Sequence, residues 1–138
     1  MLESYIENFD PEKEIESIRK KKNLKTRAEA LTAARKEIPK ESYFQDKIRR
    51  RITREYPSSF CRKIAQGAYA EAGIPDLLVI YQGHYFGFEV KRPLVGKLSA
   101  IQQRTIDLIE RSGGTAKVVF WPEEAIETIE EWRKENGL

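Results

Sequence analysis

Apolar and polar positions in residues 1–40 predict two helices of weak amphipathic character. Residues 12–22 and 26–37 contain no interior Gly or Pro, and each carries only a thin apolar stripe. Stripes of this kind are typical of helices that lie on a larger body or on a partner. Pro39 then marks a break. We therefore interpret residues 1–40 as a helical N-terminal extension.

Residues 41–56 show a stronger helical pattern. Phe44, Ile48 and Ile52 recur every four residues, so they share one face of the predicted helix. Arginines occupy much of the remaining surface, and Pro57 ends the helix. This face is expected to pack on the core of the protein.

Three strands are predicted in the middle of the chain. Residues 59–66 form a short strand, and residues 76–81 are apolar on both faces, as in a strand buried inside a sheet. Residues 85–91 alternate between apolar and polar positions. The turn at residues 82–84 allows the second and third strands to pair as an antiparallel hairpin.

The C-terminal part predicts a helix, a strand and a last helix. The first helix spans about 99–112 and is closed by Gly113 and Gly114, and the strand spans 115–121. Pro122 opens the last helix in the position that proline prefers. The order of elements indicates an α/β fold with a central mixed sheet of about four strands flanked by helices.

Composition narrows the class of protein. The 138 residues are 40% hydrophobic and 34% charged, which favours one globular domain with a real core. No apolar run is long enough for a membrane span and the first ten residues contain acids, so we expect a cytoplasmic protein without a membrane partner. With only one cysteine, Cys61, and one histidine, His84, any metal must be held by oxygen. We expect Cys61 to pack as a small hydrophobe and His84 to be exposed and non-catalytic.

Candidate chemistry lies on the hairpin. Glu89 and Lys91 are two positions apart and therefore emerge on one face, and antiparallel pairing can bring Asp76 close to Glu89. Two such carboxylates repel unless a cation lies between them, and oxygen ligands favour Mg²⁺, or Mn²⁺ as a substitute. Lys91 could then orient a nucleophile, and Gly87 would leave room for a substrate. Alternatively, Glu89 pairs with Lys91 or Arg92 at the surface, and Asp76 belongs to a turn.

Together these residues have a recognisable spacing. The segment Gly73-Ile74-Pro75-Asp76, followed thirteen positions later by Glu89-Val90-Lys91, resembles the PD-(D/E)XK phosphodiesterase signature. The rest of the pattern is similar to the VRR-NUC branch of that superfamily, whose features here are Arg92-Pro93, Leu98 to Gln102, Gly113-Gly114, Val118-Val119 and a first helix with Glu41, Gln45 and Ile48. The resemblance covers about residues 41–121.

The resemblance implies a restriction-endonuclease-like core and a set of site residues. Asp76, Glu89 and the backbone carbonyl of Val90 would hold the metal, and Lys91 would assist catalysis. Glu41 and Gln102 would complete the site, with Glu41 as a further possible metal ligand.

Two of these assignments have an alternative in helix capping. Ser42 with Gln45 forms a capping-box pattern that could leave Glu41 just outside its helix. Ser99 with Gln102 forms a second pattern of the same kind. Each of these side chains could therefore serve the site or the helix end.

Charge is unevenly distributed along the chain. Residues 41–70 carry a net charge of +4 and residues 115–138 a net charge of −3. On charge alone, ordinary solvated helix faces explain both segments. Beside a phosphodiester site, however, the basic side chains would hold DNA phosphates without reading bases, and the candidates are Lys47, Arg50, Arg51, Arg54, Arg62 and Lys63.

We therefore expect a Mg²⁺-dependent endonuclease that hydrolyses DNA phosphodiester bonds and selects branched or Holliday-junction-like structures. A two-fold junction calls for a homodimer, and a bare domain suggests a phage or mobile-element origin. Residues 41–138 would form the nuclease domain, and residues 1–40 could dock a protein partner. Two alternatives are a nucleic-acid-binding or adaptor module without its own catalysis, and an enzyme that cleaves RNA.

Overall fold

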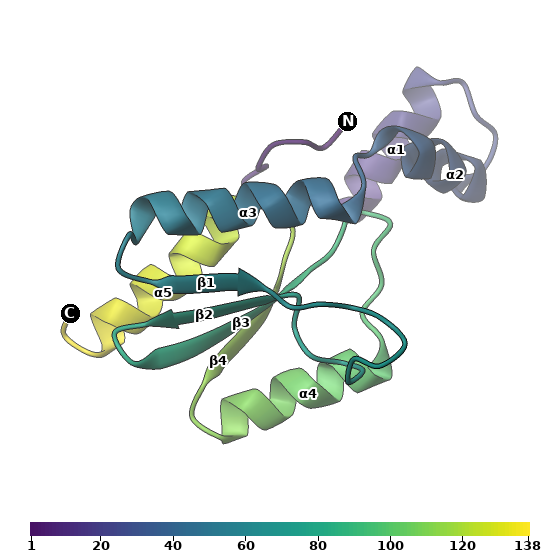
Figure 1. The fold of residues 1–138 in the computed structure, drawn as a ribbon. Helices are drawn as coiled ribbons and strands as arrows, with labels where there is room; N and C mark the ends of the chain where they lie inside the picture. Colours follow the sequence, from purple (N-terminus) through teal and green to yellow (C-terminus); the bar gives the residue numbers. More distant parts are fainter.

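A four-stranded mixed sheet lies at the centre of the computed structural model, which describes residues 1–138 (Figure 1). Its strands follow the spatial order β1-β2-β3-β4, where β1 is Phe60–Lys63, β2 is Leu77–Tyr81, β3 is His84–Val90 and β4 is Thr115–Val119. The pairs β1–β2 and β2–β3 are antiparallel, whereas β3–β4 is parallel. The predicted hairpin and the mixed sheet are therefore confirmed.

Helices cover both faces of this sheet. Helix α3 (Glu41–Glu55) lies on one face and α4 (Ala100–Arg111) on the other, and α5 (Pro122–Glu135) packs beside α3 (Figure 1). The α/β class predicted from the order of elements is confirmed.

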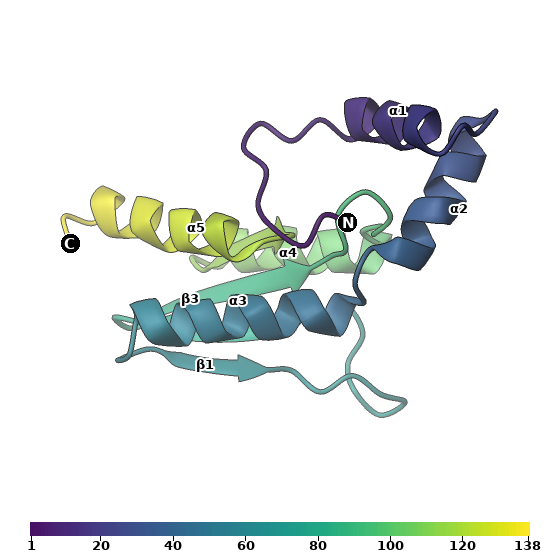
Figure 2. The same cartoon turned by 90° about the horizontal axis from the view of Figure 1, so that it is seen from above.

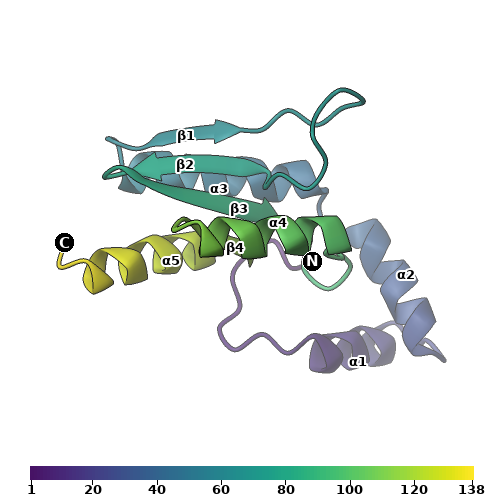
Figure 3. The same cartoon turned by 90° about the horizontal axis from the view of Figure 1, so that it is seen from below.

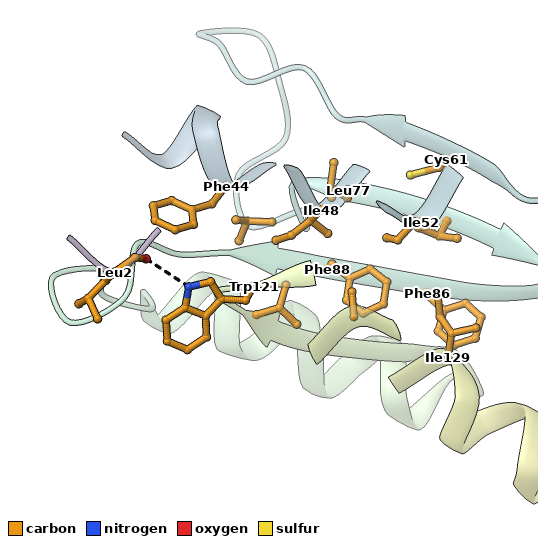
Figure 4. Close-up of a cluster of buried hydrophobic side chains, with 14 of the residues drawn as sticks. Leu2, Phe44, Ile48, Ile52, Cys61, Leu77, Phe86, Phe88, Trp121 and Ile129 are labelled. Carbon is orange, nitrogen blue, oxygen red and sulfur yellow. Dashed lines mark hydrogen bonds between the residues drawn. The ribbon is translucent and has the colours of Figure 1, made fainter. Parts of the chain in front are cut away.

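The core fills the space between the sheet and the α3–α5 layer. Phe44, Ile48 and Ile52 of α3 are fully buried and pack with Phe86 and Phe88 of β3, as Figure 4 shows. The four-residue spacing in the sequence therefore marks the inner face of α3. Burial of such aliphatic and aromatic side chains contributes about 1.5–3 kcal/mol each, which makes this layer the main source of stability.

One end of the sheet gathers the starts and ends of several elements. Both α3 and α4 begin there, β2 begins there, and β1 and β3 end there (Figure 1). This end, called the site end below, is therefore surrounded by two helix N-termini and by the connections 64–76 and 91–99.

Residues 1–40 comprise a strap and a pair of helices. An N-terminal strap, residues 1–9, crosses Trp121, whose Nε1–H donates to the Leu2 carbonyl at 3.2 Å (Figure 4). The rings of Tyr5 and Phe9 meet the indole edge-on. Helices α1 (Pro11–Lys21) and α2 (Arg27–Glu37) then pack on each other as a hairpin that projects from the body (Figure 2).

Element ends differ from the sequence prediction by a few residues. Strand β1 is shorter because the chain leaves the sheet after Lys63, with only the bond from Ile64 N–H to the Asp76 carbonyl (2.8 Å) continuing the ladder. Ser99 and Trp121 are N-caps, so α4 begins one residue later and β4 ends earlier than predicted. None of the helices α1 to α5 combines the length and the apolar character that a membrane span requires.

The prediction of an exposed His84 is wrong. Its ring stacks on Trp132 of α5, with centroids 4.6 Å apart, and its Nε2 lies 2.8 Å from Thr115 Oγ1. Burial lowers the pKa of His84. The last helix covers the turn at this point, and nothing near the turn in the sequence indicates that packing.

Candidate active site

Asp76, Glu89 and Lys91 converge at the site end of the sheet, on the face that carries α4. Their exposed fractions are 4%, 1% and 9%, respectively. The Asp76 Oδ2 atom accepts the Val90 N–H at 2.8 Å, which ties the carboxylate to the neighbouring strand. Lys91 Nζ lies 3.4 Å from Glu89 Oε1. The antiparallel register therefore brings together the three side chains that the sequence singled out.

The pKa of Glu89 is shifted by its surroundings. Burial and the negative charge of the neighbouring Asp76 raise the pKa of Glu89 to about 8, although Lys91 opposes the shift. Its Oε2 atom is buried and has no hydrogen-bond partner. A buried carboxylate oxygen without a partner is costly, and a cation placed between the two acids would satisfy it.

Gln102 performs both of the tasks that its sequence context allowed. Its Oε1 accepts the Ser99 N–H at 2.9 Å, while the Ser99 hydroxyl accepts the Gln102 N–H at 3.1 Å, so the capping box forms. The other end of the same amide, Nε2, donates to Glu89 Oε1 at 2.8 Å. The start of α4 is thereby joined to the acid on β3.

Glu41 is the first residue of α3 and faces the site. Lys40 is the N-cap and no side-chain capping bond forms, so the capping box of Ser42 with Gln45 is not made. Instead, the Gln45 amide donates to Glu41 Oε1 at 3.2 Å. Burial and the charge of Asp76 raise the pKa of Glu41.

The donor set is small. No three or more His, Cys, Asp or Glu side chains come together as a metal cluster. A metal here would therefore depend on Asp76, Glu89, the Val90 carbonyl and water, and direct contact with Glu41 stays a prediction. This set, with a partnerless Glu89 oxygen, fits a hard divalent ion that keeps several waters.

Two glycines shape the site in ways that the sequence did not indicate. A Cβ on Gly87 would lie 2.8 Å from the Tyr85 hydroxyl and 2.9 Å from Pro75 Cγ, so the space above Gly87 is filled by protein. The prediction that Gly87 leaves room for a substrate is therefore wrong. A Cβ on Gly96 would lie 2.7 Å from the Arg92 carbonyl, so the connection after β3 can pack against Lys91 and Arg92 only with glycine there.

The basic side chains of α3 lie apart from this trio. Helix α3 covers the opposite sheet face from α4, and its arginines belong to the half that runs away from Glu41. Lys47 donates to the Glu3 carbonyl at 2.7 Å, and Arg51 pairs with Glu55 at 2.9 Å. Arg50 and Arg54 line open hollows on the outer surface of α3.

The two basic residues of β1 lie differently. Lys63 is paired with Leu77, the residue after Asp76, and therefore stands at the site end. The Arg62 guanidinium lies 4.4 Å from the ring centre of Phe60 and donates to the Cys61 carbonyl. Cys61 itself is buried, as expected. DNA binding by all six basic residues stays a prediction.

Comparison with known proteins finds one similar solved structure. No family model matches the sequence, and no curated protein matches it. A solved structure described as a VRR_NUC domain is similar, with a TM-score of 0.53 and 27% sequence identity over 65% of this chain and 94% of that one. This similarity in sequence and fold supports a VRR-NUC domain in the chain. The VRR-NUC domain is of a nuclease type, and its α/β fold agrees with the restriction-endonuclease-like core expected from the sequence.

Proposed function

We propose that this protein is a Mg²⁺-dependent endonuclease that hydrolyses phosphodiester bonds in branched DNA. The observation that carries the proposal is the buried pair Asp76 and Glu89 beside Lys91, with one Glu89 oxygen lacking any partner. A purely structural site has little reason to keep two repelling acids out of water. The VRR-NUC domain supports the choice of a nuclease.

The metal would be held by Asp76, Glu89 and the Val90 carbonyl, with Glu41 in reach through water. Mg²⁺ suits this oxygen-only set, and Mn²⁺ can replace it. When bound, the ion supplies Lewis acidity and makes hydroxide available from water near neutral pH.

The protein's own groups then position the reactants. Lys91, 3.4 Å from Glu89, can donate to the attacking water and to a phosphate oxygen, and its charge offsets the negative charge that develops on phosphorus. Gln102 holds the Glu89 carboxylate in one orientation. The water oxygen bonds to phosphorus, and the bond from phosphorus to the sugar oxygen of the leaving strand breaks. The attacking water loses a proton to solvent, and the leaving oxygen takes up a proton from a solvent water.

The proposed choice of substrate rests on the absence of a base-reading motif in the sequence and on the symmetry of a four-way DNA junction. No recognition helix or zinc finger is present in the sequence, so phosphate contacts and nucleic-acid shape are the available means of selection. A four-way junction has two equivalent strands to cut, so we propose a homodimer that presents one active site to each.

The proposal is tested by single substitutions Asp76→Asn, Glu89→Gln and Lys91→Met. Cleavage of a four-way junction, a flap and a linear duplex is measured with Mg²⁺. We expect each rate to fall by about 10³-fold or more, since each change removes charge from the reacting centre. Glu131→Gln and Lys117→Met, at exposed positions, are matched controls that keep full activity. Undiminished cleavage by all three site variants would refute the proposal.

A second candidate is a nucleic-acid-binding or adaptor module, and the absence of a third clustered carboxylate is the observation that favours it. Calorimetric titration with Mn²⁺ separates the two. Binding that disappears in Glu89→Gln supports the enzyme. DNA binding without a metal site supports the adaptor, and the same panel with RNA substrates tests RNA cleavage.

A further inference from the structure

The hairpin of α1 and α2, with its connections, forms an arm of residues 10–40 that projects from the site end of the sheet. Figures 2 and 3 show α2 running outward from the start of α3, the end of the molecule at which α4 also begins. Helix α2 has 11 residues and is therefore about 16 Å long. The tip of the arm, where α1 and α2 are joined, is the part of the arm farthest from the start of α3.

The arm is held in place by a residue next to the site. Arg92, which follows Lys91, donates to three backbone carbonyls at the end of α2: Pro39 at 2.9 Å, Arg35 at 2.7 Å and Ile38 at 2.8 Å. These carbonyls would otherwise be unsatisfied at the helix C-terminus. The orientation of the arm is therefore fixed relative to Lys91.

The tip of the arm is strongly basic. Residues 19–27 contain six Lys or Arg and no Asp or Glu. Some of these charges are neutralised within the arm, since Arg19 pairs with Glu16, Lys22 with Glu37 and Arg27 with Glu12.

The remaining three charges of the tip are available to a ligand. Lys21 and Lys25 form no ion pair, and Lys20, 71% exposed, reaches Glu16 only at 4.0 Å. The dipole of α1 accounts for cations in its last turn, but Lys25 lies in the turn beyond that helix. The tip thus presents three exposed, uncommitted lysines on a support fixed to the catalytic strand.

We infer that Lys20, Lys21 and Lys25 form a second contact for the phosphate backbone of the nucleic acid whose phosphodiester bond lies at the active site. The inference rests on the proposed function for its ligand. It assigns to the arm a task separate from chemistry: holding a length of duplex at a distance from the site.

The first test is the salt dependence of binding. A 30-base-pair duplex is titrated in EDTA with the wild-type protein and with the triple variant Lys20→Gln, Lys21→Gln, Lys25→Gln. We expect affinity at 0.1 M salt to fall about 10- to 100-fold, and the slope of log affinity against log salt to decrease by about 2 to 3, since each phosphate contact contributes about 0.9. The matched control neutralises three exposed residues outside the arm: Arg111 at the end of α4, Lys117 on β4 and Lys134 in the last turn of α5.

A second measurement is independent of affinity. Cys61 is buried, so a photoactivatable cross-linker can be attached selectively to Lys21→Cys or, as a control, to Lys134→Cys. We expect cross-links to the duplex from position 21 and none from position 134. Equal affinity loss in both triple variants, or no cross-link at 21, would overturn the inference. Both measurements are made without cleavage. They can therefore support the inference even if the nuclease assay fails, and they can contradict it even if the nuclease assay succeeds.

Discussion

The sheet layer and the arm bury side chains of different sizes. Between the sheet and α3 the buried side chains are large, with Phe44, Phe86 and Phe88 all fully buried. In the arm the fully buried side chains of α2 are Ala30 and Ala34. The sheet layer is therefore stabilised by burial of large aromatic side chains, whereas the arm buries smaller aliphatic ones, with Ile15 and Ile18 of α1 also buried.

This difference in buried side chains makes the sheet layer rigid and leaves the arm easier to displace. A core of large side chains loses several kcal/mol when one of them is truncated, so it keeps Asp76 and Glu89 in one geometry. An arm whose helices bury two isoleucines and two alanines, and which is held by backbone-carbonyl contacts, can be released at lower cost. Truncation of a buried side chain should therefore cost more in the sheet layer than in the arm.

The largest effect is expected in the sheet. Phe88→Ala should lower the free energy of unfolding by about 3–5 kcal/mol, because it opens a cavity in a layer that cannot collapse around it. Ala30→Gly in α2 should cost about 1 kcal/mol, from helix propensity. Urea denaturation followed by circular dichroism measures both. Equal costs would contradict the distinction between the two regions.

A smaller effect is expected where the regions meet. Arg92→Ala removes three hydrogen bonds to the end of α2 and should destabilise the arm by about 2 kcal/mol, since bonds to a charged donor contribute more than neutral ones. Trypsin cleavage between residues 19 and 27 should accelerate, and amide exchange in α2 should rise while β3 stays protected. Arg104→Ala, an exposed position on α4, is the control. Exchange that rises equally in α2 and β3 would mean that the arm and the sheet unfold together.

The smallest effect should be a gain in stability at the site. Because the pKa of Glu89 is raised in the folded state, the native protein binds its proton more tightly than the unfolded chain does, and stability falls as pH rises from about 4.5 to about 8. Glu89→Gln should therefore raise the free energy of unfolding in EDTA by about 1 kcal/mol or more at pH 9, and by little at pH 4. Thermal unfolding at both pH values measures it, with Glu131→Gln as control. A loss of stability at pH 9 would show that the pair with Lys91 outweighs repulsion by Asp76.

Local pattern was enough to predict much of the fold and the central trio. Alternation along β3 placed Glu89 and Lys91 on one face, and the short turn placed Asp76 beside them. What the sequence could not give is packing between distant segments. The stacking of His84 on Trp132 depends on where α5 ends, and the filling of the space above Gly87 depends on Pro75.

Topology explains the other differences. The basic residues of α3 come shortly before β1 in the sequence, and this closeness along the chain is the reason for predicting that they flank the site. Helix α3 nevertheless lies on the opposite face from α4, so its last turns are separated from Glu89 by the sheet. The contact of Arg92 with the end of α2 joins residues more than fifty positions apart, and no local pattern announces it.

The amide of Gln102 has two chemically different ends, and both are engaged. If it turned over, its oxygen would oppose the Glu89 carboxylate and its NH₂ would oppose the Ser99 N–H. The amide therefore fits in one orientation only, and any shift of the first turn of α4 would move the group that holds the Glu89 carboxylate. A substitution in that turn would consequently lower the activity of the protein without preventing it from folding.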